Sequence, residues 1–441
     1  MQSADPSAPG KSEATGFADP YSRYVMGVLF LVYVVSYIDR QLMAVLLDPI
    51  KHELGASDAQ MGLLTGIAFA IFYSVFGLPI ARLADRSSRR TVIAASVAAW
   101  SLMTALTGWT RSYTQILLAR IGVGVGEAGG GAPSHALLSD YFPPDQRGRA
   151  LALLSGGGAV GIMLGLWLGG VLGDLFGWRM AFWLLGFPGL AVALLVRLTV
   201  REPPRGRFDG GGARESDPLG VTLRYLWQRR AFVYMTLAAT LHVFAGFGAS
   251  NWHPSFLRRV HGLTGSEVGF WLGPVTQVAA FVGGVSSGWI SDRLGRRDLR
   301  WYMWVPLLGS LVTLPFSYGF LLADSFPLAI ACMVPAAFLG NSYAGVTFAM
   351  AQGIARPAMR ATAAAVVLFV MNVGGLGMGP TIFGAMSTWL EPRFGQESIR
   401  VALMIVGIPH LVACVFNWLA ARTLREDLAF GQQVDSGDAR K

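Results

Sequence analysis

The sequence has few charged residues: Asp, Glu, Lys and Arg together make up 14% of its 441 residues. A soluble domain usually carries about a quarter charged residues, so an ordinary cytosolic enzyme is disfavoured. Only two cysteines are present, Cys332 and Cys414, and both lie in long apolar runs. A disulfide framework or a zinc site is therefore not predicted, and we expect neither a bound metal nor a cofactor.

Long apolar runs dominate the chain, which is 53% hydrophobic and contains 55 Gly. A helix needs about 20 apolar residues to cross the hydrocarbon core of a bilayer. Windows of that length give twelve candidate spans, at residues 24–46, 58–81, 91–110, 114–138, 150–173, 179–200, 231–257, 268–290, 301–322, 326–352, 361–390 and 398–422. None shows the alternation of apolar and polar residues that marks barrel strands. The sequence therefore predicts an all-α membrane protein with twelve transmembrane helices.

The distribution of Lys and Arg predicts how these spans are oriented. If both termini are cytoplasmic, 26 of the 35 Lys and Arg lie in inner segments and 7 lie in outer loops. Cytoplasmic loops carry an excess of positive charge, so we expect both termini to lie on the cytoplasmic side. The membrane would be the cell membrane, which is the inner membrane if the source is bacterial. The excess positive charge, +9 net, then faces the anionic lipids of the inner leaflet. The basic composition therefore does not indicate a nucleic-acid partner, and none is expected.

A polar segment divides the chain into two halves. Residues 201–218 contain Pro, a Gly run and mixed charges, which is typical of a flexible linker. Residues 219–230 read as a short amphipathic helix that either lies at the membrane surface or leads into the seventh span. The expected domains are a cytoplasmic tail at 1–23, a six-helix bundle at 24–200, a linker at 201–230, a second six-helix bundle at 231–422 and a cytoplasmic tail at 423–441.

The two bundles carry a repeated loop. Residues 81–90 after the second span and 288–297 after the eighth align without a gap, 207 positions apart, so that Asp85 matches Asp292. The paired Arg of each loop also match, and the first and seventh spans begin at the same separation. A parallel repeat of six helices is typical of carriers that rock one half against the other.

The second copy of the loop, Gly288-x-x-x-Asp292-Arg293-x-Gly295-Arg296-Arg297, resembles the cytoplasmic signature of the major facilitator superfamily. The first copy has Ala81 and Ser88 where that family usually has Gly. The resemblance implies the two-bundle major facilitator fold. Carboxylates accept hydrogen bonds from helix N-termini and from Arg, so we expect a cytoplasmic gate that breaks when the inner side opens. The residues assigned to this gate are Asp85, Arg86, Arg89, Asp292, Arg293 and Arg296.

Four charged residues lie inside the predicted spans and away from their ends: Asp39, Arg40, Arg120 and Glu127. Such residues are costly in a membrane unless paired or hydrated, which makes them functional candidates. Glu127 follows Arg120 by seven residues and so shares its helix face, and the surrounding Gly residues leave it room in a cavity. We expect Glu127 to carry a proton and Arg120 to bind an anionic head group beside it. A purely structural Arg–Glu pair is the alternative.

The second half lacks such charges, because spans seven to twelve contain no Asp, Glu, Lys or Arg away from their ends. Its polar side chains are more typical of helix packing than of ligand binding; they are His242, Asn251, His253, Asn341, Asn372 and His410. The cavity between the halves should be charged on one wall and apolar on the other, which fits an anionic head with an apolar tail. None of the six His has a carboxylate or Cys at ligand spacing, so an enzyme is not predicted.

Three segments are similar to the Spinster family of carriers. They are Ser36-Tyr37-Ile38-Asp39-Arg40, Arg120-x-Gly-x-Gly-x-Gly126-Glu127-Ala128, and Leu47-Asp48-Pro49-Ile50 leading to Gly62-Leu63-Leu64. That family moves lysophospholipids and sphingolipid signals, so the resemblance implies a lipid-like substrate. It also implies that Asp39, Arg40, Arg120 and Glu127 form the polar end of the site, with Asp39 sharing the proton and Arg40 sharing the head group. Similar motifs occur in proton-coupled organic-anion carriers. The Gly-rich fifth span resembles proton antiporters, which favours export.

The sequence thus predicts a monomeric, proton-coupled transporter of an amphiphilic anionic or zwitterionic substrate. It would work by alternating access, driven by the proton gradient, with membrane lipid and the substrate as its partners. The alternatives are a proton-coupled symporter of small organic anions such as sugar acids, and a multidrug exporter. A long apolar cavity would favour the amphiphile, whereas a small polar cavity with Arg on both walls would favour the symporter.

Overall fold

The computed structural model describes residues 16–208 and 218–435. Residues 209–217 of the predicted linker, and 1–15 and 436–441 of the two predicted tails, lie outside the described residues. Every regular element within the described ranges is helical, as the apolar runs predict. The last helix continues beyond residue 422, where the sequence placed the start of a tail, and ends at Asp435.

The first half of the chain, α1 to α8, forms six spans and is called the N half. Its helices are α1 (Pro20–Val45), the short α2 (Leu47–Leu54), α3 (Asp58–Thr65), α4 (Ile67–Arg86), α5 (Arg89–Thr107), α6 (Tyr113–Glu127), α7 (Gly131–Tyr141) and α8 (Pro144–Thr199). The second span is α3 followed by α4, and the fourth is α6 followed by α7. Spans five and six both lie within α8, which turns at Gly177; its φ of 80° is a left-handed value that glycine adopts readily.

The second half, α10 to α19, repeats this arrangement and is called the C half. Its helices are α10 (Arg230–His261), α11 (Gly265–Phe270), α12 (Thr276–Gly295), α13 (Trp301–Leu322), α14 (Phe326–Gly340), α15 (Ala344–Ile354), α16 (Arg360–Val370), α17 (Met378–Phe394), α18 (Ser398–Leu403) and α19 (Gly407–Asp435). Turns of π-helix at Trp271–Val275 and Met371–Gly377 join the pieces of the eighth and eleventh spans. The helix α9 (Leu219–Trp227) precedes α10.

Length and hydropathy alone find fewer spans than the fold contains. Nine stretches of the described residues are long and apolar enough to cross a membrane. Two of them, Pro144–Thr199 and Arg360–Ala429, each hold two spans. The pair α6 and α7 supplies the twelfth span, which the criterion misses because a break after Glu127 leaves two short pieces. The twelve predicted spans are therefore all helical.

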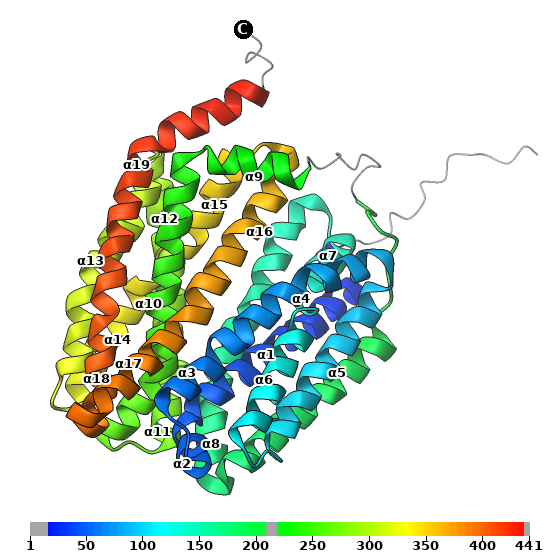
Figure 1. Ribbon diagram of the computed structural model, residues 1–441. Coiled ribbons are helices and arrows are strands. Elements are labelled where there is room, and N and C mark those ends of the chain that lie inside the picture. The colour runs from blue at the N-terminus through cyan, green and yellow to red at the C-terminus, as the bar shows by residue number, and fades with distance from the viewer. Residues whose placement is uncertain (1–15, 209–217, 436–441) are drawn as a thin grey trace, which may run out of the picture.

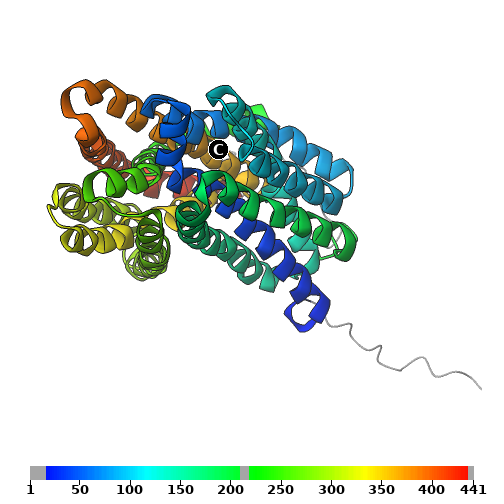
Figure 2. The same cartoon turned by 90° about the horizontal axis from the view of Figure 1, so that it is seen from below.

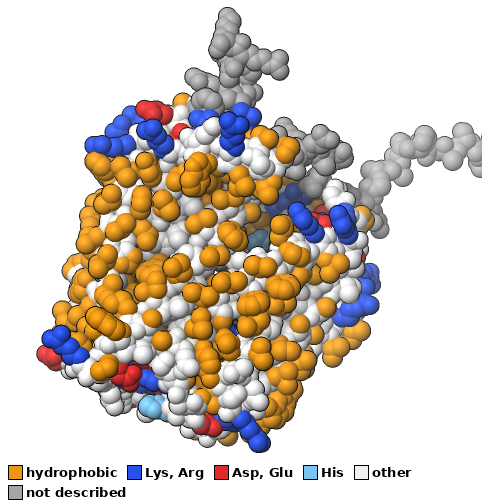
Figure 3. Space-filling model, viewed as in Figure 1, with side chains coloured by type: hydrophobic (Ala, Val, Ile, Leu, Met, Phe, Trp, Pro, Cys, Tyr) orange, Lys and Arg blue, Asp and Glu red, His pale blue; other side chains and the backbone are white. Residues whose placement is uncertain are grey.

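The two halves lie side by side and diverge toward one end (Figure 1). We call the end that carries α9 the linker end. The opposite end carries α2, α3 and α11, and is called the sealed end; Figure 2 views the molecule from that side. Apolar side chains cover the middle of the face in Figure 3, and Lys and Arg gather at its two ends. This distribution is that of a protein whose middle faces lipid.

A buried ion-pair network closes the sealed end. Arg259 at the end of α10 lies 2.7 Å from Asp58 on α3 and 2.6 Å from Asp48 on α2. Lys51 lies 2.8 Å from Asp58, and Ser387 of α17 donates to Asp58 at 2.7 Å. The Asp58 side chain has no exposed surface. One carboxylate of the N half thus gathers cationic and hydroxyl partners from both halves.

A second contact between the two halves joins α8 to α11. Asp174 accepts hydrogen bonds from the backbone N–H groups of Gly265 at 3.1 Å and Ser266 at 2.6 Å, so a side chain of the N half caps a helix of the C half. The backbones are close here: a Cβ on Gly170 would lie 2.0 Å from the carbonyl oxygen of Gly265. Hydrogen bonds and ion pairs between described residues of the two halves all lie at the sealed end.

Candidate functional site

Glycine residues position Glu127 at the end of α6. A Cβ on Gly126 would lie 2.7 Å from the backbone nitrogen of Trp100, and one on Gly129 would lie 2.0 Å from the Ser96 hydroxyl oxygen. Only hydrogen at these positions allows α5 to lie this close. Residues 128–130 then turn before α7 begins. The Gly run therefore brings α5 against one side of α6 and leaves the carboxylate at its C-terminal end.

Glu127 is paired with Arg40. The Nε of Arg40 on α1 lies 2.5 Å from Oε2 of Glu127, and Ser36 donates to the same oxygen at 3.1 Å. The Glu127 side chain is fully buried, whereas 13% of the Arg40 side chain is exposed. The sequence analysis placed Glu127 beside Arg120 because they share a helix face. In the structure the ion pair is made by Arg40, which comes from α1.

Aromatic rings surround the two guanidinium groups. The Arg40 guanidinium carbon lies 4.9 Å from the ring centres of Tyr37 and Phe69 and 5.1 Å from that of Tyr73. The Arg120 guanidinium carbon lies 4.7 Å from the Phe69 ring. Cation–π attraction of this kind is worth up to about 2 kcal/mol in a desolvated place. Sequence reasoning missed these rings, although Tyr37 precedes Arg40 by one helical turn and Phe69 precedes Tyr73 by one.

Asp39 is buried next to this pair, and Thr104 of α5 donates to it at 3.1 Å. Three buried atoms of the cluster have no hydrogen-bond partner among the described residues: Oδ1 of Asp39, Nε of Arg120 and Oε1 of Glu127. Buried polar atoms normally find partners. These open positions suit groups that take up a proton or meet a ligand during part of a cycle.

A small cavity of about 80 Å³ lies over the ion pair. Glu127, Arg40, Ser36, Tyr33 and Tyr73 are among the side chains that line it. Glu127 therefore faces an internal space of the N half and not the lipid-facing surface. This placement meets the requirement that a proton-carrying group be inside the bundle.

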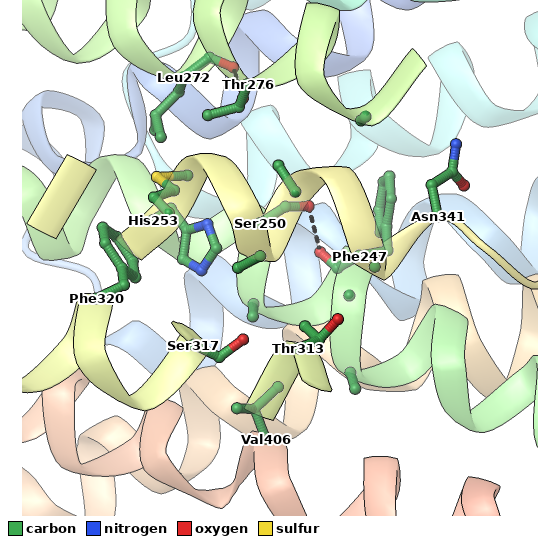
Figure 4. A pocket seen from close by; sticks show the side chains of 18 of the residues that line it. Phe247, Ser250, His253, Leu272, Thr276, Thr313, Ser317, Phe320, Asn341 and Val406 are labelled. Carbon is green, nitrogen blue, oxygen red and sulfur yellow. Dashed lines mark hydrogen bonds between the residues drawn. The ribbon is translucent and has the colours of Figure 1, made fainter. Parts of the chain in front are cut away.

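A larger cavity of about 370 Å³ lies mainly in the C half (Figure 4). Most of its labelled residues come from α10, α12 and α13, with Phe247, Thr276 and Phe320 among them. The other labelled residues are Leu272, Asn341 and Val406, and α1 contributes Gln41 to the lining. No Asp, Glu, Lys or Arg is among the described residues that line it. Six polar side chains of the second half were named from the sequence, and four of them lie in the wall of this cavity: His242, His253, Asn341 and His410.

Two of the His side chains of this cavity have hydrogen-bond partners. The two ring nitrogens of His242 lie 3.3 Å from the Ser310 hydroxyl and 3.1 Å from the Asn417 amide nitrogen. His410 contacts the carbonyl oxygen of Val406 at 2.9 Å. Asn251 donates to a carbonyl of its own helix, and neither it nor Asn372 is among the lining residues. The described lining of this cavity is therefore uncharged and mainly apolar, with uncharged polar side chains such as Gln41, Gln277 and Ser317 among it.

The predicted gate residues lie at the linker end, in contact with their own halves. Arg89 lies 2.5 Å from Asp140 within the N half. Asp292 accepts a hydrogen bond from Tyr302 at 3.1 Å within the C half, and Arg293 lies over a tryptophan of its own helix. A gate that breaks when this end opens would show this arrangement. Its closed contacts stay a prediction, as do the roles of Arg86, Arg296 and Asp85.

Outside the spans, the carboxylate of Glu53 on α2 shows a clear electrostatic effect. Trp178 donates to Glu53 at 2.6 Å, and this hydrogen bond, together with one from Arg179, lowers the pKa of Glu53. The pair Glu53–Arg179 joins two elements of the N half and does not bridge the halves.

Among the described residues, no group of three or more His, Cys, Asp and Glu could hold a metal ion.

Comparison with known proteins identifies several relatives. A family model described as Major Facilitator Superfamily matches residues 29–318. An "MFS-type efflux pump" of Mycolicibacterium smegmatis is 33% identical, with 91% of this chain and 93% of that protein covered. The "D-galactonate transporter" of Escherichia coli is 26% identical, with 82% and 88% covered. A crystal structure of a bacterial homologue of the human lysosomal transporter Spinster, in an inward-facing and unoccupied conformation, superposes with a TM-score of 0.86. It is 31% identical, with 93% of this chain and 98% of that chain covered.

Proposed function

The chain belongs to the major facilitator superfamily of membrane transporters, and from that premise we propose that it moves an amphiphilic anionic or zwitterionic substrate, coupled to protons. A lysophospholipid- or sphingolipid-like molecule has this chemistry. The protein is Spinster-like and multi-pass, a transporter rather than an enzyme. The identity of the substrate and the use of the proton gradient are our proposals.

The contrast between the two cavities carries the proposal. The N half holds the buried Arg40–Glu127 pair at a small polar cavity. The C half holds a cavity of about 370 Å³ whose described lining has no charged side chain. An anionic head at Arg40 and an apolar tail against Phe247 and Phe320 match these two environments. A small sugar acid would favour a polar cavity with Arg on both walls, and no Arg is among the described residues that line the C-half cavity.

The ion pair also suggests how a proton is coupled. The Arg40 guanidinium cannot form its full ion pair with Glu127 and with a substrate anion at the same time. When the head group takes Arg40, the buried Glu127 carboxylate loses its partner, and neutralisation by a proton removes the cost of a buried charge. Proton and anion would then bind together and move in the same direction. This coupling is symport, whereas the resemblance of the Gly-rich fifth span to proton antiporters favours export; the direction in which substrate moves under an imposed pH gradient distinguishes the two.

The linker end is proposed to face the cytoplasm. The helix α9 and the end of the last described helix lie at this end (Figure 1), and 26 of the 35 Lys and Arg are in segments assigned to it from the sequence. The open linker end and the sealed opposite end then correspond to an inward-facing state. The similar Spinster homologue was captured in an inward-facing conformation, which supports this proposal.

Transport in proteoliposomes tests the function. Labelled lysophospholipid should be moved in response to an imposed pH gradient, and a protonophore should abolish the movement. Ala336→Trp, which fills the C-half cavity, should reduce transport of long-chain substrates by at least about tenfold while sparing a short-chain analogue. Saturable, proton-dependent uptake of D-galactonate without any lysophospholipid transport would overturn the proposal and favour the organic-anion symporter.

The identity to an efflux pump favours multidrug export as a second candidate function. The uncharged C-half cavity could hold an apolar drug without any contact to Arg40. That function predicts transport of uncharged compounds that is insensitive to Arg40→Gln. The amphiphile transporter predicts that the same variant loses transport of its anionic substrate.

A further inference from the structure

The helix α9 has apolar residues on two faces. Tyr225 and Leu226 face the C half and are 7% and 1% exposed. Leu219, Leu223 and Trp227, spaced four residues apart, form an outward stripe and are 57%, 42% and 79% exposed. The sequence left open whether this segment lies on the membrane or leads into α10. The structure separates α9 from α10 and lays it across the linker end (Figure 1), which is the arrangement of an interfacial helix.

An apolar groove of about 520 Å³ lies between α9, α10 and α16. Leu226, Phe232, Leu237, Val366 and Val370 are among its walls. Thr236 also lines it, but this hydroxyl already donates to the carbonyl oxygen of Phe232 at 2.7 Å. The groove shares no lining residue with the C-half cavity. Its walls can hold a hydrocarbon chain and offer no site for a polar ligand in their interior.

Basic side chains stand at the rim of this groove. Arg224 lines it and is exposed, and Arg230, also exposed, is the first residue of α10, one turn before the lining residue Val233. No Asp or Glu is among the described residues that line the groove. The carboxylate of Asp427, which lies near, is bonded to the backbone N–H of Ala231 at 2.7 Å. The rim thus presents positive charge beside an apolar slot.

Two further guanidinium groups hold α9 in place. The guanidinium carbons of Arg229 and Arg356 lie 4.7 Å and 4.8 Å from the ring centre of Tyr225. The Tyr225 hydroxyl donates to the carbonyl oxygen of Ile354 at 3.3 Å. These contacts tie the helix to α10 and to the end of α15, so the groove and its rim are preformed.

We propose that this groove is a binding site for an anionic phospholipid of the leaflet at the linker end. The acyl chain would lie between α9, α10 and α16, and the phosphate would meet Arg224 and Arg230. The exposed Trp227 would lie at head-group depth, where tryptophan is enriched in membrane proteins. This lipid is bound from the bilayer and is separate from the transported substrate, because the groove and the C-half cavity have different walls.

Native mass spectrometry of the delipidated full chain tests the site. Phosphatidylglycerol and phosphatidylcholine with the same acyl chains are added in turn, and the first bound lipid is counted. The wild type should favour phosphatidylglycerol by at least about fivefold, since one Arg near a membrane surface contributes about 1 kcal/mol. Arg224→Gln with Arg230→Gln should lower that preference to below about twofold. Val366→Trp should reduce the first binding event for both lipids, because it fills the slot.

Arg197→Gln is the matched control. Arg197 is an exposed Arg at the linker end of α8 and lies outside the groove. It should leave the preference unchanged. Equal binding of the two lipids by the wild type, or the same loss in the control variant, would overturn the proposal. Dimers of the chain that form without lipid and vanish in Val366→Trp would show that a second copy occupies the groove, which would also overturn it.

Discussion

Nε of Arg40 lies 2.5 Å from Oε2 of Glu127, and this contact joins α1 to the end of α6 in the interior of the N half. Removing one partner of a buried ion pair leaves an uncompensated charge, at a cost of about 3–5 kcal/mol. The pair is therefore either kept intact or neutralised by a ligand and a proton together. Predictions about transport and about stability both follow from this constraint.

Glu127→Gln should abolish proton-driven transport and leave the protein folded. Glutamine cannot take up a proton, but its amide oxygen can still accept the hydrogen bonds of Arg40 and Ser36. We expect transport against a pH gradient to fall at least about a hundredfold, while substrate exchange without a gradient continues. Proteoliposome assays at several pH values measure both. Glu397→Gln is the control, because that carboxylate is 47% exposed and pairs with Arg400 within the C half. Wild-type, pH-dependent transport by Glu127→Gln would contradict the proposed role of the carboxyl.

Arg40 and Arg120 should differ in their effect on binding. Arg40 lines the cavity beside Glu127, whereas Arg120 is 5% exposed and covers Phe69. We expect Arg40→Gln to weaken binding of an anionic substrate by at least about tenfold, since a charge-assisted hydrogen bond is worth about 1.5–3 kcal/mol. Arg120→Gln should weaken it less. Isothermal titration with a phosphate-bearing and a neutral amphiphile measures the difference. Equal losses for both substrates would show that Arg40 only supports the fold.

The spans could be predicted from the sequence because each one must bury about 20 residues in lipid, and apolar runs record this directly. The breaks within them were not predicted. The helix of the second span is interrupted at Gly66, between α3 and α4. A Cβ at this position would lie 2.3 Å from the carbonyl oxygen of Gly377. That break depends on how closely the eleventh span approaches, and a single span's composition carries no information about its neighbour.

The sequence identified the charged residues of the buried cluster but not their pairing, and their roles in transport stay a prediction. Charged residues inside apolar runs identify Asp39, Arg40, Arg120 and Glu127 at once, because lipid makes them costly. Spacing along one helix favoured Arg120 as the partner of Glu127. The observed partner, Arg40, comes from another helix 87 positions away, and such a contact is set by helix packing. The network at Asp58 was missed for the same reason.

Arg259→Ala should open the sealed end. It removes the ion pairs that Arg259 makes with Asp48 and Asp58, and it leaves Asp58 with Lys51 of its own half and the hydroxyl of Ser387. We expect the population open at this end to rise at least about tenfold, as judged by spin-label distances between α3 and α17. Arg179→Ala is the matched control, because Arg179 pairs with Glu53 at the same end but within the N half. A similar opening in both variants would show that surface charge, and not the cross-half network, holds the end closed.

Gly170→Val should disrupt the contact between α8 and α11 by steric means alone. A Cβ at this position would lie 2.0 Å from the carbonyl oxygen of Gly265, which is well inside van der Waals contact and involves a backbone atom that cannot rotate away. The helices α8 and α11 must separate, and Asp174 then loses the N–H groups that it caps. Two charge-neutral residues are exchanged, so the effect should be independent of ionic strength, unlike that of Arg259→Ala. We expect a single cysteine placed on α11 to become labelled at least about tenfold faster. Gly148→Val is the control, because a Cβ there would meet nothing within 4 Å. If labelling at α11 stays at the wild-type rate in Gly170→Val, the close backbone contact does not seal this end, and the ion pairs alone keep the halves together there.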